Sequence, residues 1–437
     1  MTRKHTLRAL TVCAALAATA AQANPWELFG FTPRAMGMGG TATARSDDLS
    51  GAYYNPAAMI GHTKTEFGFS LSGNFMALHI DRTNPNSPNS SSLPDSQERA
   101  ELALIFPMGG LLKDTVVLGL TLGHPIGSLI RVQTVDESHP QFYMYQSKPQ
   151  RFASSATIGI KIMNGLSIGL GAQIIAEQVG TVKFNVDVAA KRFVARDITI
   201  DLNTKPRPMA SLLIEPNDWL RIGFSWRMET SLYYAQPTDL NLGDIGDINL
   251  NVEGTAQFWP HVFSLGVAFK PTRHWNITLQ ADYLLWQRAT RDQVQVSITP
   301  SGPVLDGLGL SDLLGFGSAD PAPGFVNILQ PRLAAEWYPT DNVTLRGGVW
   351  VRPAITPDQT GTTNYLDNFT ESVSLGFTYK FPDLLKIFPD PVSLDLAVSS
   401  IFANERSYAK RQATDATGGA SFGGSIWTVG AGLRYQY

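Results

Sequence analysis

Few side chains in this sequence are arranged for covalent or metal chemistry. A nucleophilic enzyme needs a serine, cysteine or threonine beside a positioned base, and the Gly-x-Ser-x-Gly turn that presents many such serines does not occur. Beyond residue 23 the histidines lie far apart, without the spacing of metal ligands; they are His62, His79, His124, His139, His261 and His274. The sequence therefore predicts no enzyme activity, no metal site and no cofactor.

A glycine-rich stretch at 37–40, Gly-Met-Gly-Gly, superficially resembles a phosphate-binding loop. Such loops end in Lys-Ser or Lys-Thr and follow a buried strand, and this stretch has neither feature. Glycines that permit tight packing are the better interpretation. A net charge of -3 also gives no reason to expect nucleic acid as a partner.

The N-terminus has the three parts of a secretory signal peptide. Basic residues at 3–8 precede an apolar run at 9–21 and an Ala-x-Ala site, which predicts cleavage after Ala23. The single cysteine, Cys13, lies inside this signal, so the mature chain has no thiol chemistry. We therefore expect an exported protein from which residues 1–23 have been removed.

A two-residue period predicts the elements that carry the remaining polar residues. Apolar and aromatic residues alternate with polar residues or glycine over most of 220–229, 343–352, 372–381 and 427–437. Successive side chains of a strand point to opposite faces, so each segment has one apolar and one polar face. The pattern predicts an all-β protein.

The polar face is expected to point inward, toward a lumen. The strands have about 10 residues or more, which is long for a soluble sheet and right for tilted transmembrane strands. Aromatic residues gather at strand ends, as in the belts of outer-membrane barrels. They are Trp219, Trp275, Trp337, Tyr338, Tyr379, Phe381, Tyr435 and Tyr437, the last being the end of the chain.

About fourteen such strands are expected. They lie near 66–81, 98–107, 115–124, 150–162, 166–178, 207–215, 219–229, 255–270, 274–287, 327–339, 342–352, 370–381, 391–402 and 424–437. Short connections alternate with long ones, and both chain ends lie on the short side, as in bacterial barrels. An open edge in hydrocarbon would leave backbone groups unsatisfied. Residues 66–437 are thus predicted to form a closed transmembrane antiparallel β-barrel in a Gram-negative outer membrane.

Residues 24–65 belong to no predicted strand. A barrel of this size has a lumen wide enough to leak, and the segment is too apolar for a disordered tail. Its apolar residues include Trp26, Phe29, Phe31, Met36, Met38, Tyr53, Tyr54 and Met59. We expect this segment to fold inward as a plug, or hatch; the alternative is a periplasmic tail.

The same segment resembles a known family. Gly30-Phe31, the Met-Gly-Met-Gly-Gly stretch at 36–40, Ser-Asp-Asp at 46–48 and Asn55-Pro56-Ala57 are similar to the hatch of the FadL/TodX-type outer-membrane transporters of long-chain fatty acids and hydrocarbons. These are plugged fourteen-stranded barrels of about this length. The resemblance implies passive uptake of a hydrophobic small molecule or fatty acid by a monomer embedded in outer-membrane lipid.

The resemblance also implies a route. The ligand would land on an apolar groove among the outer loops, enter a lumen pocket, and leave sideways beside a kinked third strand when the hatch moves. Gly119, Gly123 and Pro125 are where the kink could form, because proline interrupts a ladder and glycine permits a bulge; alternatively, Pro125 only starts the next loop. The Asn-Pro-Ala triplet is interpreted as a rigid wedge that closes the exit.

Candidate ligand contacts follow from the strand pattern and from one loop. The lumen-facing arginines that could hold a carboxylate are Arg221, Arg227, Arg346 and Arg434, although pairing with lumen acids such as Asp282, Glu336 or Asp395 is the commoner role. The outer-loop residues that could form the apolar groove, or simply pack on one another, are Leu308, Leu310, Leu313, Leu314 and Phe316.

Two other functions fit a barrel of this kind. A relative with the same fold could serve as a secretion or surface-attachment partner, and the hatch would look similar. A general porin is also conceivable, but the apparent plug argues against it. The sequence does not distinguish a fatty acid from an aromatic hydrocarbon or another lipid as the ligand.

Overall fold

The computed structural model describes most of the chain from Trp26 onward. The described ranges are 26–84, 91–126, 138–145, 153–187, 192–289, 294–307, 316–317, 324–361, 363–383, 390–410 and 417–437. The expected signal peptide lies outside them. Within these ranges, no helix has the length and apolar character needed to cross a bilayer.

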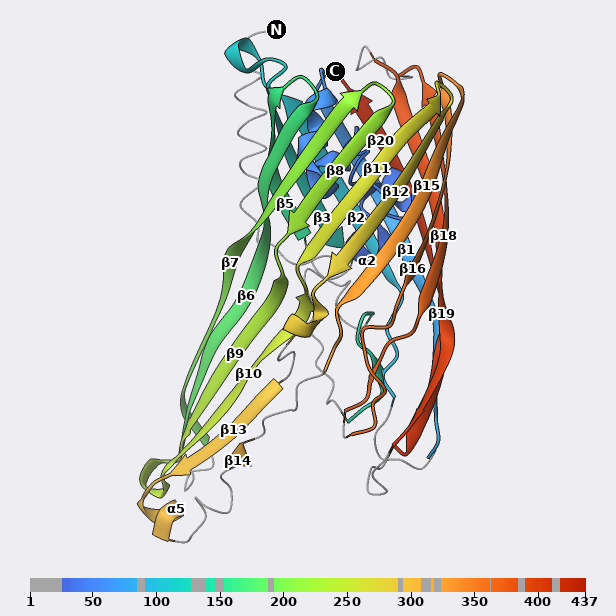
Figure 1. The fold of residues 1–437 in the computed structure, drawn as a ribbon. Helices are drawn as coiled ribbons and strands as arrows, with labels where there is room; N and C mark the ends of the chain where they lie inside the picture. Colours follow the sequence, from blue (N-terminus) through green and yellow to red (C-terminus); the bar gives the residue numbers. More distant parts are fainter. Residues whose placement is uncertain are drawn as a thin grey trace.

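Fourteen antiparallel strands close into a barrel (Figure 1). They are β1 (Glu66–Arg82), β2 (Gln97–Pro107), β3 (Val116–Pro125), β5 (Ala153–Met163), β6 (Leu166–Asp187), β7 (Arg192–Asn217), β8 (Leu220–Arg227), β11 (Val262–Thr272), β12 (Trp275–Leu284), β15 (Ile328–Thr340), β16 (Val343–Arg352), β18 (Thr370–Phe381), β19 (Val392–Ala409) and β20 (Gly419–Gln436). Each pairs with the next around the ring, and β1 pairs with β20 to close it. The predicted fold class is confirmed.

Several strand boundaries differ from the sequence prediction, among them those of β6, β7, β11, β19 and β20. β7 begins at Arg192 rather than near 207, because it continues beside β6 well beyond the barrel. The strand expected from 255 begins only at Val262. Pro260 precedes it, and proline has no amide hydrogen to donate to the ladder; the residues before Pro260 belong to another strand, β10 (Asp247–Trp259).

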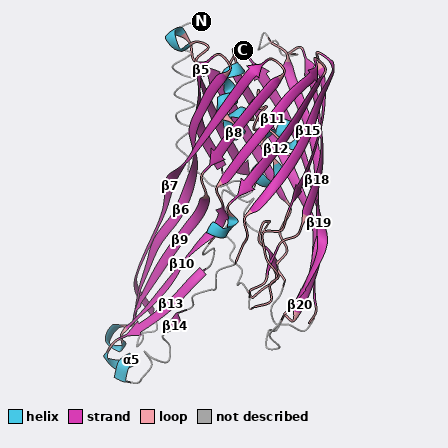
Figure 2. Ribbon diagram, in the orientation of Figure 1, coloured by secondary structure: helices cyan, strands magenta, loops and turns pink. Residues whose placement is uncertain are grey.

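An arm of strands extends the barrel on the long-loop side (Figures 1 and 2). Besides β10 and the ends of β6 and β7, it contains β9 (Thr230–Asn241), β13 (Val294–Ser301) and β14 (Phe316–Gly317), with α5 (Pro303–Gly307) near its far end. β10 pairs with β9 and β13, and β9 runs parallel to β6. These segments were predicted to be loops, because strands that project into water need no continuous apolar face and so lack the two-residue period.

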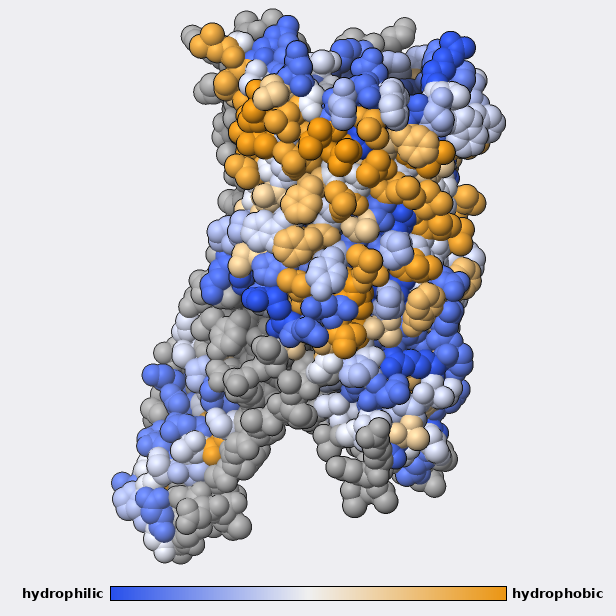
Figure 3. All heavy atoms as spheres, in the orientation of Figure 1, coloured by the Kyte–Doolittle hydropathy of each residue, from blue (hydrophilic) through white to orange (hydrophobic). Residues whose placement is uncertain are grey.

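The outward-facing side chains of the barrel are apolar, as predicted. In β18, Val373 and Leu375 are exposed whereas Ser372 and Ser374 are buried. Figure 3 shows a hydrophobic band across the barrel between two hydrophilic zones. Near the short turns the rings of two tryptophans, on β12 and β15, stack with centroids 5.8 Å apart. An apolar band with aromatic residues at its edge is the surface of a membrane barrel.

Residues 26–61, called the N-terminal segment below, lie inside the barrel and appear in blue in Figure 1. They form α2 (Trp26–Phe29), α3 (Thr32–Gly37), α4 (Gly51–Tyr54) and the 3-10 helix η1 (Pro56–Gly61), and nearly all of them are buried. Glycines allow close contact with the wall: a Cβ on Gly37 would lie 2.6 Å from the Cα of Gly376. Gly223 and Gly348 make similar room for the backbone of the segment.

Several further short elements lie in the connections between the strands. β4 (Gln141–Phe142) pairs in parallel with β17 (Tyr365–Leu366), which brings two long connections together. The 3-10 helix η2 (Gly110–Leu112) forms the turn between β2 and β3, and η4 (Trp286–Arg288) follows β12. The long connections therefore have local structure of their own, which positions the residues described next.

Candidate functional site

A buried ionic network joins the N-terminal segment to the barrel wall. Glu336 of β15 is 0% exposed. Its carboxylate accepts hydrogen bonds from Nε of Arg34 at 3.1 Å, Nε of Arg346 at 2.8 Å and Nε of Arg45 at 3.3 Å. Buried charges are tolerated when they are paired and hydrogen-bonded. The network therefore ties α3 and the chain that follows it to β15 and β16.

The Ser-Asp-Asp stretch extends this network. Arg34 also pairs with Asp48 at 2.9 Å and with Asp47 at 3.1 Å. Arg221 of β8 lies 3.5 Å from Asp47 and 2.7 Å from Glu215. Acidic and basic side chains, contributed by both the segment and the wall, thus alternate, which lowers the cost of placing so many charges inside the barrel.

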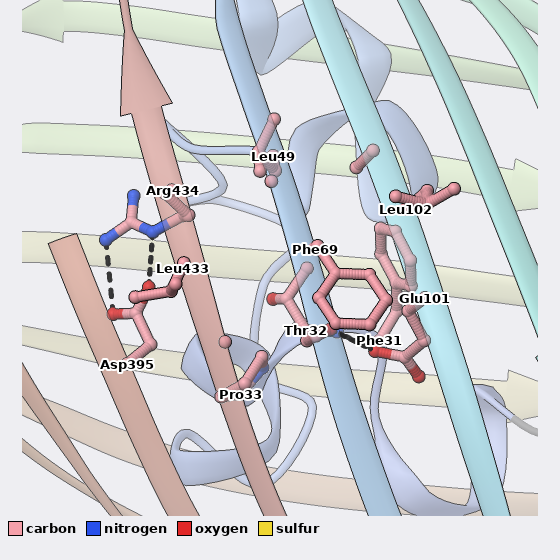
Figure 4. A pocket seen from close by; sticks show the side chains of 14 residues that line it. Phe31, Thr32, Pro33, Leu49, Phe69, Glu101, Leu102, Asp395, Leu433 and Arg434 are labelled. Carbon is pink, nitrogen blue, oxygen red and sulfur yellow. Dashed lines mark hydrogen bonds and ion pairs between the residues drawn. The ribbon is translucent and has the colours of Figure 1, made fainter. Parts of the chain in front are cut away.

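All four arginines predicted to face the lumen pair with acids. Arg227 donates from Nε to Glu27 at 2.7 Å. Arg434 pairs with Glu66 at 3.0 Å and also with Asp395; Figure 4 shows its contact with Asp395. The other two belong to the network just described. These ion pairs match the structural role considered for the four arginines, and their binding of a ligand carboxylate stays a prediction.

The Asn-Pro-Ala triplet is held rigidly between the segment and the wall. Asn55 accepts a hydrogen bond from the amide of Ala57 at 3.0 Å and donates from Nδ2 to the carbonyl of Thr43 at 2.6 Å. The carbonyl of Pro56 lies against Gly159 of β5, where a Cβ would come within 2.5 Å of it. The triplet thus packs on the part of the wall formed by β5, β6 and β7.

The ladder of the third strand shows no bulge at Gly119, Gly123 or Pro125, and the kink stays a prediction. β3 pairs with β2 from Val117 to Pro125 without a shift of register, and with β5 as far as Gly123. Gly119 makes room for Met59, and a Cβ on Gly123 would lie 2.5 Å from the ring of Trp26. The two glycines therefore serve the packing of the N-terminal segment rather than a bulge.

The loop predicted to supply an apolar groove is only partly described. Leu308, Leu310, Leu313 and Leu314 lie outside the described residues. The backbone of Phe316 begins β14 and pairs with Ile298 of β13. The groove stays a prediction.

A cluster of buried aromatic side chains, called the aromatic cluster below, lies between the long connections and α2. It consists of Phe29, Phe142, Tyr143, Tyr145, Phe258, Trp259, Trp286, Phe325, Trp350, Tyr365, Tyr408 and Phe422, with smaller apolar residues. The ring centroids of Tyr143 and Phe325 are 4.4 Å apart, and those of Trp259 and Trp286 are 5.3 Å apart. The cluster was not predicted from the sequence, because most of its members lie in long connections where apolar residues do not recur at a regular spacing. The run Phe-Tyr-Met-Tyr at 142–145 is a local concentration of aromatic residues that could have indicated it.

The lumen face of β1 changes character along its length. Met76, Leu78 and Ile80 pack against the aromatic cluster. Closer to the short turns, Ser70 and Ser72 occupy the same face and are buried polar residues. The lumen face of β1 is therefore apolar on the long-loop side and polar beside the N-terminal segment.

A strained turn of the N-terminal segment borders this polar zone (Figure 4). Thr32 has a φ of 66°, which a β-branched residue rarely adopts and which costs energy. Its amide donates to Oε2 of Glu101 at 3.2 Å, and the hydroxyl of Ser70 donates to the same oxygen at 2.9 Å. A cavity with about 260 Å³ of empty space, part of it open to solvent, lies beside the turn.

Known proteins share this architecture. The fold is similar to that of a Pseudomonas aeruginosa FadL homologue (TM-score 0.59, 15% identity, 96% of this chain and 98% of that chain) and of the P. putida toluene transporter TodX (TM-score 0.59, 12% identity, 94% and 99%). It is also similar to the Ralstonia pickettii toluene transporter TbuX (TM-score 0.54, 14% identity, 94% and 100%). At these identities the likeness shows the fold alone. A comparison with curated protein sequences finds no match.

Family membership comes from a sequence model of a family. The model described as outer membrane protein transport protein (OMPP1/FadL/TodX) matches residues 12–437, nearly the whole chain. Together with the closed barrel, this match places the protein in the outer membrane of a Gram-negative bacterium. The chain belongs to the OMPP1/FadL/TodX family of outer-membrane transport proteins.

Proposed function

We propose that the protein takes up hydrophobic molecules, such as long-chain fatty acids, passively across the outer membrane. The aromatic cluster is the observation that carries this proposal. A porin has a polar, water-filled lumen, whereas here buried rings and the apolar face of β1 occupy the interior on the long-loop side. Apolar cavities with a few placed polar groups bind apolar ligands. Membership in a transport family also means that the chain is not an enzyme.

The ligand class includes aromatic hydrocarbons as well as fatty acids in this proposal. Two of the similar structures are named as toluene transporters, and the aromatic cluster would accept a flat ring or an alkyl chain equally well. A monomer would suffice, because the ligand moves down its gradient through the lumen of one chain. Neither a cofactor nor an energy source is required.

The N-terminal region, 24–65, acts as the hatch in this proposal. One flank of the segment is tied to β15 and β16 by ion pairs at Glu336. The other flank, α4 and η1, meets β3, β5 and β6 largely through small residues, including Gly119 and Gly159. Movement is expected at the second flank, because fewer buried ion pairs hold it; the pair at its end is His62–Glu66, at 3.3 Å. An exit beside β3, from the aromatic cluster to the membrane, fits this position.

Uptake measurements test the proposal. Cells that lack their own transporter would express the full-length protein, and entry of radiolabelled oleate and toluene would be followed. Trp286→Ala, in the aromatic cluster, should slow uptake of both ligands. Trp219→Ala is the matched control, because Trp219 is exposed near the short turns; it should leave uptake unchanged. Absence of uptake by the unsubstituted protein would refute the proposed function.

A role as a secretion or surface-attachment partner is the second candidate. The observation that favours it is the arm formed by β6, β7, β9, β10 and β13, which extends beyond the barrel on the long-loop side (Figure 1). Such an arm offers strand edges to another protein. Loss of secreted or surface-bound proteins from a deletion strain, with unchanged uptake of oleate, would support this candidate over transport.

A further inference from the structure

One turn on the short-turn side of the barrel is longer and more apolar than its neighbours. The turn between β2 and β3 takes residues 108–115, whereas two residues suffice between β5 and β6, β7 and β8, β11 and β12, and β15 and β16. Its sequence is Met-Gly-Gly-Leu-Leu-Lys-Asp-Thr. Two adjacent leucines therefore lie at the rim that faces the periplasm in bacterial barrels.

An ordered backbone presents these leucines away from the protein. Leu111 is fully exposed and Leu112 is 43% exposed, so no residue of the described chain covers the first of them. The amide of Lys113 donates to the carbonyl of Gly110 at 3.3 Å. Gly110 has a φ of 63° and Asp114 a φ of 60°, values that glycine and aspartate adopt more readily than most residues. The turn thus has a defined shape, with its leucines pointing outward.

Hydrogen bonds to a neighbouring strand fix the position of the turn. The amide of Lys161 in β5 donates to the carbonyl of Thr115 at 2.8 Å, and the amide of Met108 donates to the carbonyl of Val116 at 2.9 Å. Figure 1 shows the turn, in teal, standing out from the rim beside the end of β5. The leucines are therefore held next to the outer face of the wall.

Apolar side chains of that wall connect the leucines to the membrane face. Phe106 of β2, Leu118 of β3 and Ile162 of β5 are exposed and point outward in the alternation of their strands. In Figure 3, hydrophobic surface reaches from the band to this corner of the rim, whereas much of the remaining rim in that view is hydrophilic. The leucines thus continue the surface that contacts lipid.

The chemistry of the turn suits the boundary between headgroups and acyl chains. Each buried leucine favours an inserted state over an aqueous one by about tenfold or more. Lys113 follows the leucines, and a lysine can lay its stem along apolar surface while its ammonium stays among phosphates. Asp114 carries the opposite charge, so the leucines supply most of the attraction.

We propose that the β2–β3 turn docks into the periplasmic leaflet, with Leu111 and Leu112 among phospholipid acyl chains and the ammonium of Lys113 near the phosphates. A second copy of the chain or a periplasmic protein could also cover an apolar turn, but the continuity with the lipid face favours phospholipid. The inference goes beyond the proposed function. It gives the short-turn end of β3, the strand against which α4 and η1 pack, an anchor in the membrane.

Fluorescence quenching in lipid nanodiscs tests the inference. The sole cysteine, Cys13, lies in the expected signal peptide, so Lys113→Cys gives the exported chain one thiol for a bimane label and keeps both leucines. The nanodiscs contain phosphatidylethanolamine and phosphatidylglycerol brominated near the headgroup end of their acyl chains. The label should lose most of its fluorescence to the bromine atoms and little to iodide in the water. Asp341→Cys, in the exposed turn between β15 and β16, is the matched control; its label should respond to iodide only.

A second variant assigns the quenching to the leucines. Adding Leu111→Ser and Leu112→Ser to Lys113→Cys should abolish most quenching by brominated lipid and raise the fraction of label accessible to iodide by up to about tenfold.

Three outcomes would overturn the inference. They are strong iodide quenching while both leucines are present, equal quenching by brominated lipid with and without them, and shielding from both quenchers, which would indicate contact with a second copy. The electrophoretic mobility of unheated samples confirms that each variant retains its barrel. No transported ligand enters this experiment, so its result is independent of the proposed function.

Discussion

Replacing Glu336 by glutamine should loosen the N-terminal segment without unfolding the barrel. The carboxylate accepts from three arginines at 2.8 to 3.3 Å. Removing one partner of a buried ion pair costs about 3–5 kcal/mol, because the remaining charge stays buried. Arg34 and Arg45 keep Asp47 as a partner at 3.1 and 3.3 Å. The low end of that range therefore applies, about 3 kcal/mol.

The expected loosening can be measured by hydrogen exchange. A loss of about 3 kcal/mol corresponds to a more than hundredfold rise in the population of the opened segment. Amides of residues 34–48 should then exchange about a hundred times faster, while those of β15 and β16 stay protected. In a planar bilayer, the same variant should show more frequent open-channel events than the unsubstituted protein.

The matched control is Asp367→Asn. Asp367 is equally buried and pairs with Arg352 at 2.7 Å, but both residues lie outside the N-terminal segment. This variant should leave the exchange of 34–48 unchanged. The reasoning fails if Glu336→Gln has no effect on that exchange, or if Asp367→Asn accelerates it to the same extent.

Four further predictions follow from the contacts described above. Gly348→Val should displace the N-terminal segment, because a Cβ there meets the segment's backbone; conductance should rise while the barrel still assembles. Replacing residues 55–57 by Ser-Gly-Ser should change the rate of oleate uptake while the barrel still assembles. An unchanged rate would show that the triplet only connects the N-terminal segment to β1. Leu375→Arg, on the lipid face, should destabilise the folded barrel by up to about 2–4 kcal/mol in urea titrations, whereas Ser374→Ala on the lumen face should not. Burial alone would lower the pKa of His62, but the hydrogen bond and the charge of Glu66 raise this pKa above its ordinary value. Hydrogen exchange of the amides of residues 56–61 should therefore be slow at low pH and should accelerate as the pH rises through the raised pKa. An exchange rate that does not depend on pH, after correction for intrinsic exchange, would contradict this prediction.

The barrel was predictable because strands between lipid and a polar lumen alternate apolar and polar residues with a period of two. Leu375 and Ser374 illustrate the rule: one faces lipid, the other faces the lumen, and the pattern appears directly in the sequence. The arm was not predictable in the same way. Strands such as β9 project beyond the membrane, so neither face must be apolar, and the period disappears.

The contacts inside the barrel were harder to predict. Alternation shows that Glu336 faces the lumen, but its partner Arg34 is 302 residues away in the chain, and no local pattern connects them. Arg99 and Glu101 share the lumen face of β2 by the same alternation, which from sequence suggests an ordinary ion pair. Only the structure shows that their charged groups are 4.0 Å apart and that Arg99 has no hydrogen bond in the described part of the chain.

The turn at Thr32 has a consequence for how fast the segment can respond. A non-glycine residue in this conformation stores about 1–3 kcal/mol, and the hydrogen bond that holds it contributes about 0.5–1.5 kcal/mol net. The hydrogen bond alone therefore offsets only part of this strain, and the burial of α3 against β18, β19 and β20 must hold the turn in place. A ligand that loosens those contacts would let the stored strain speed the release of the turn.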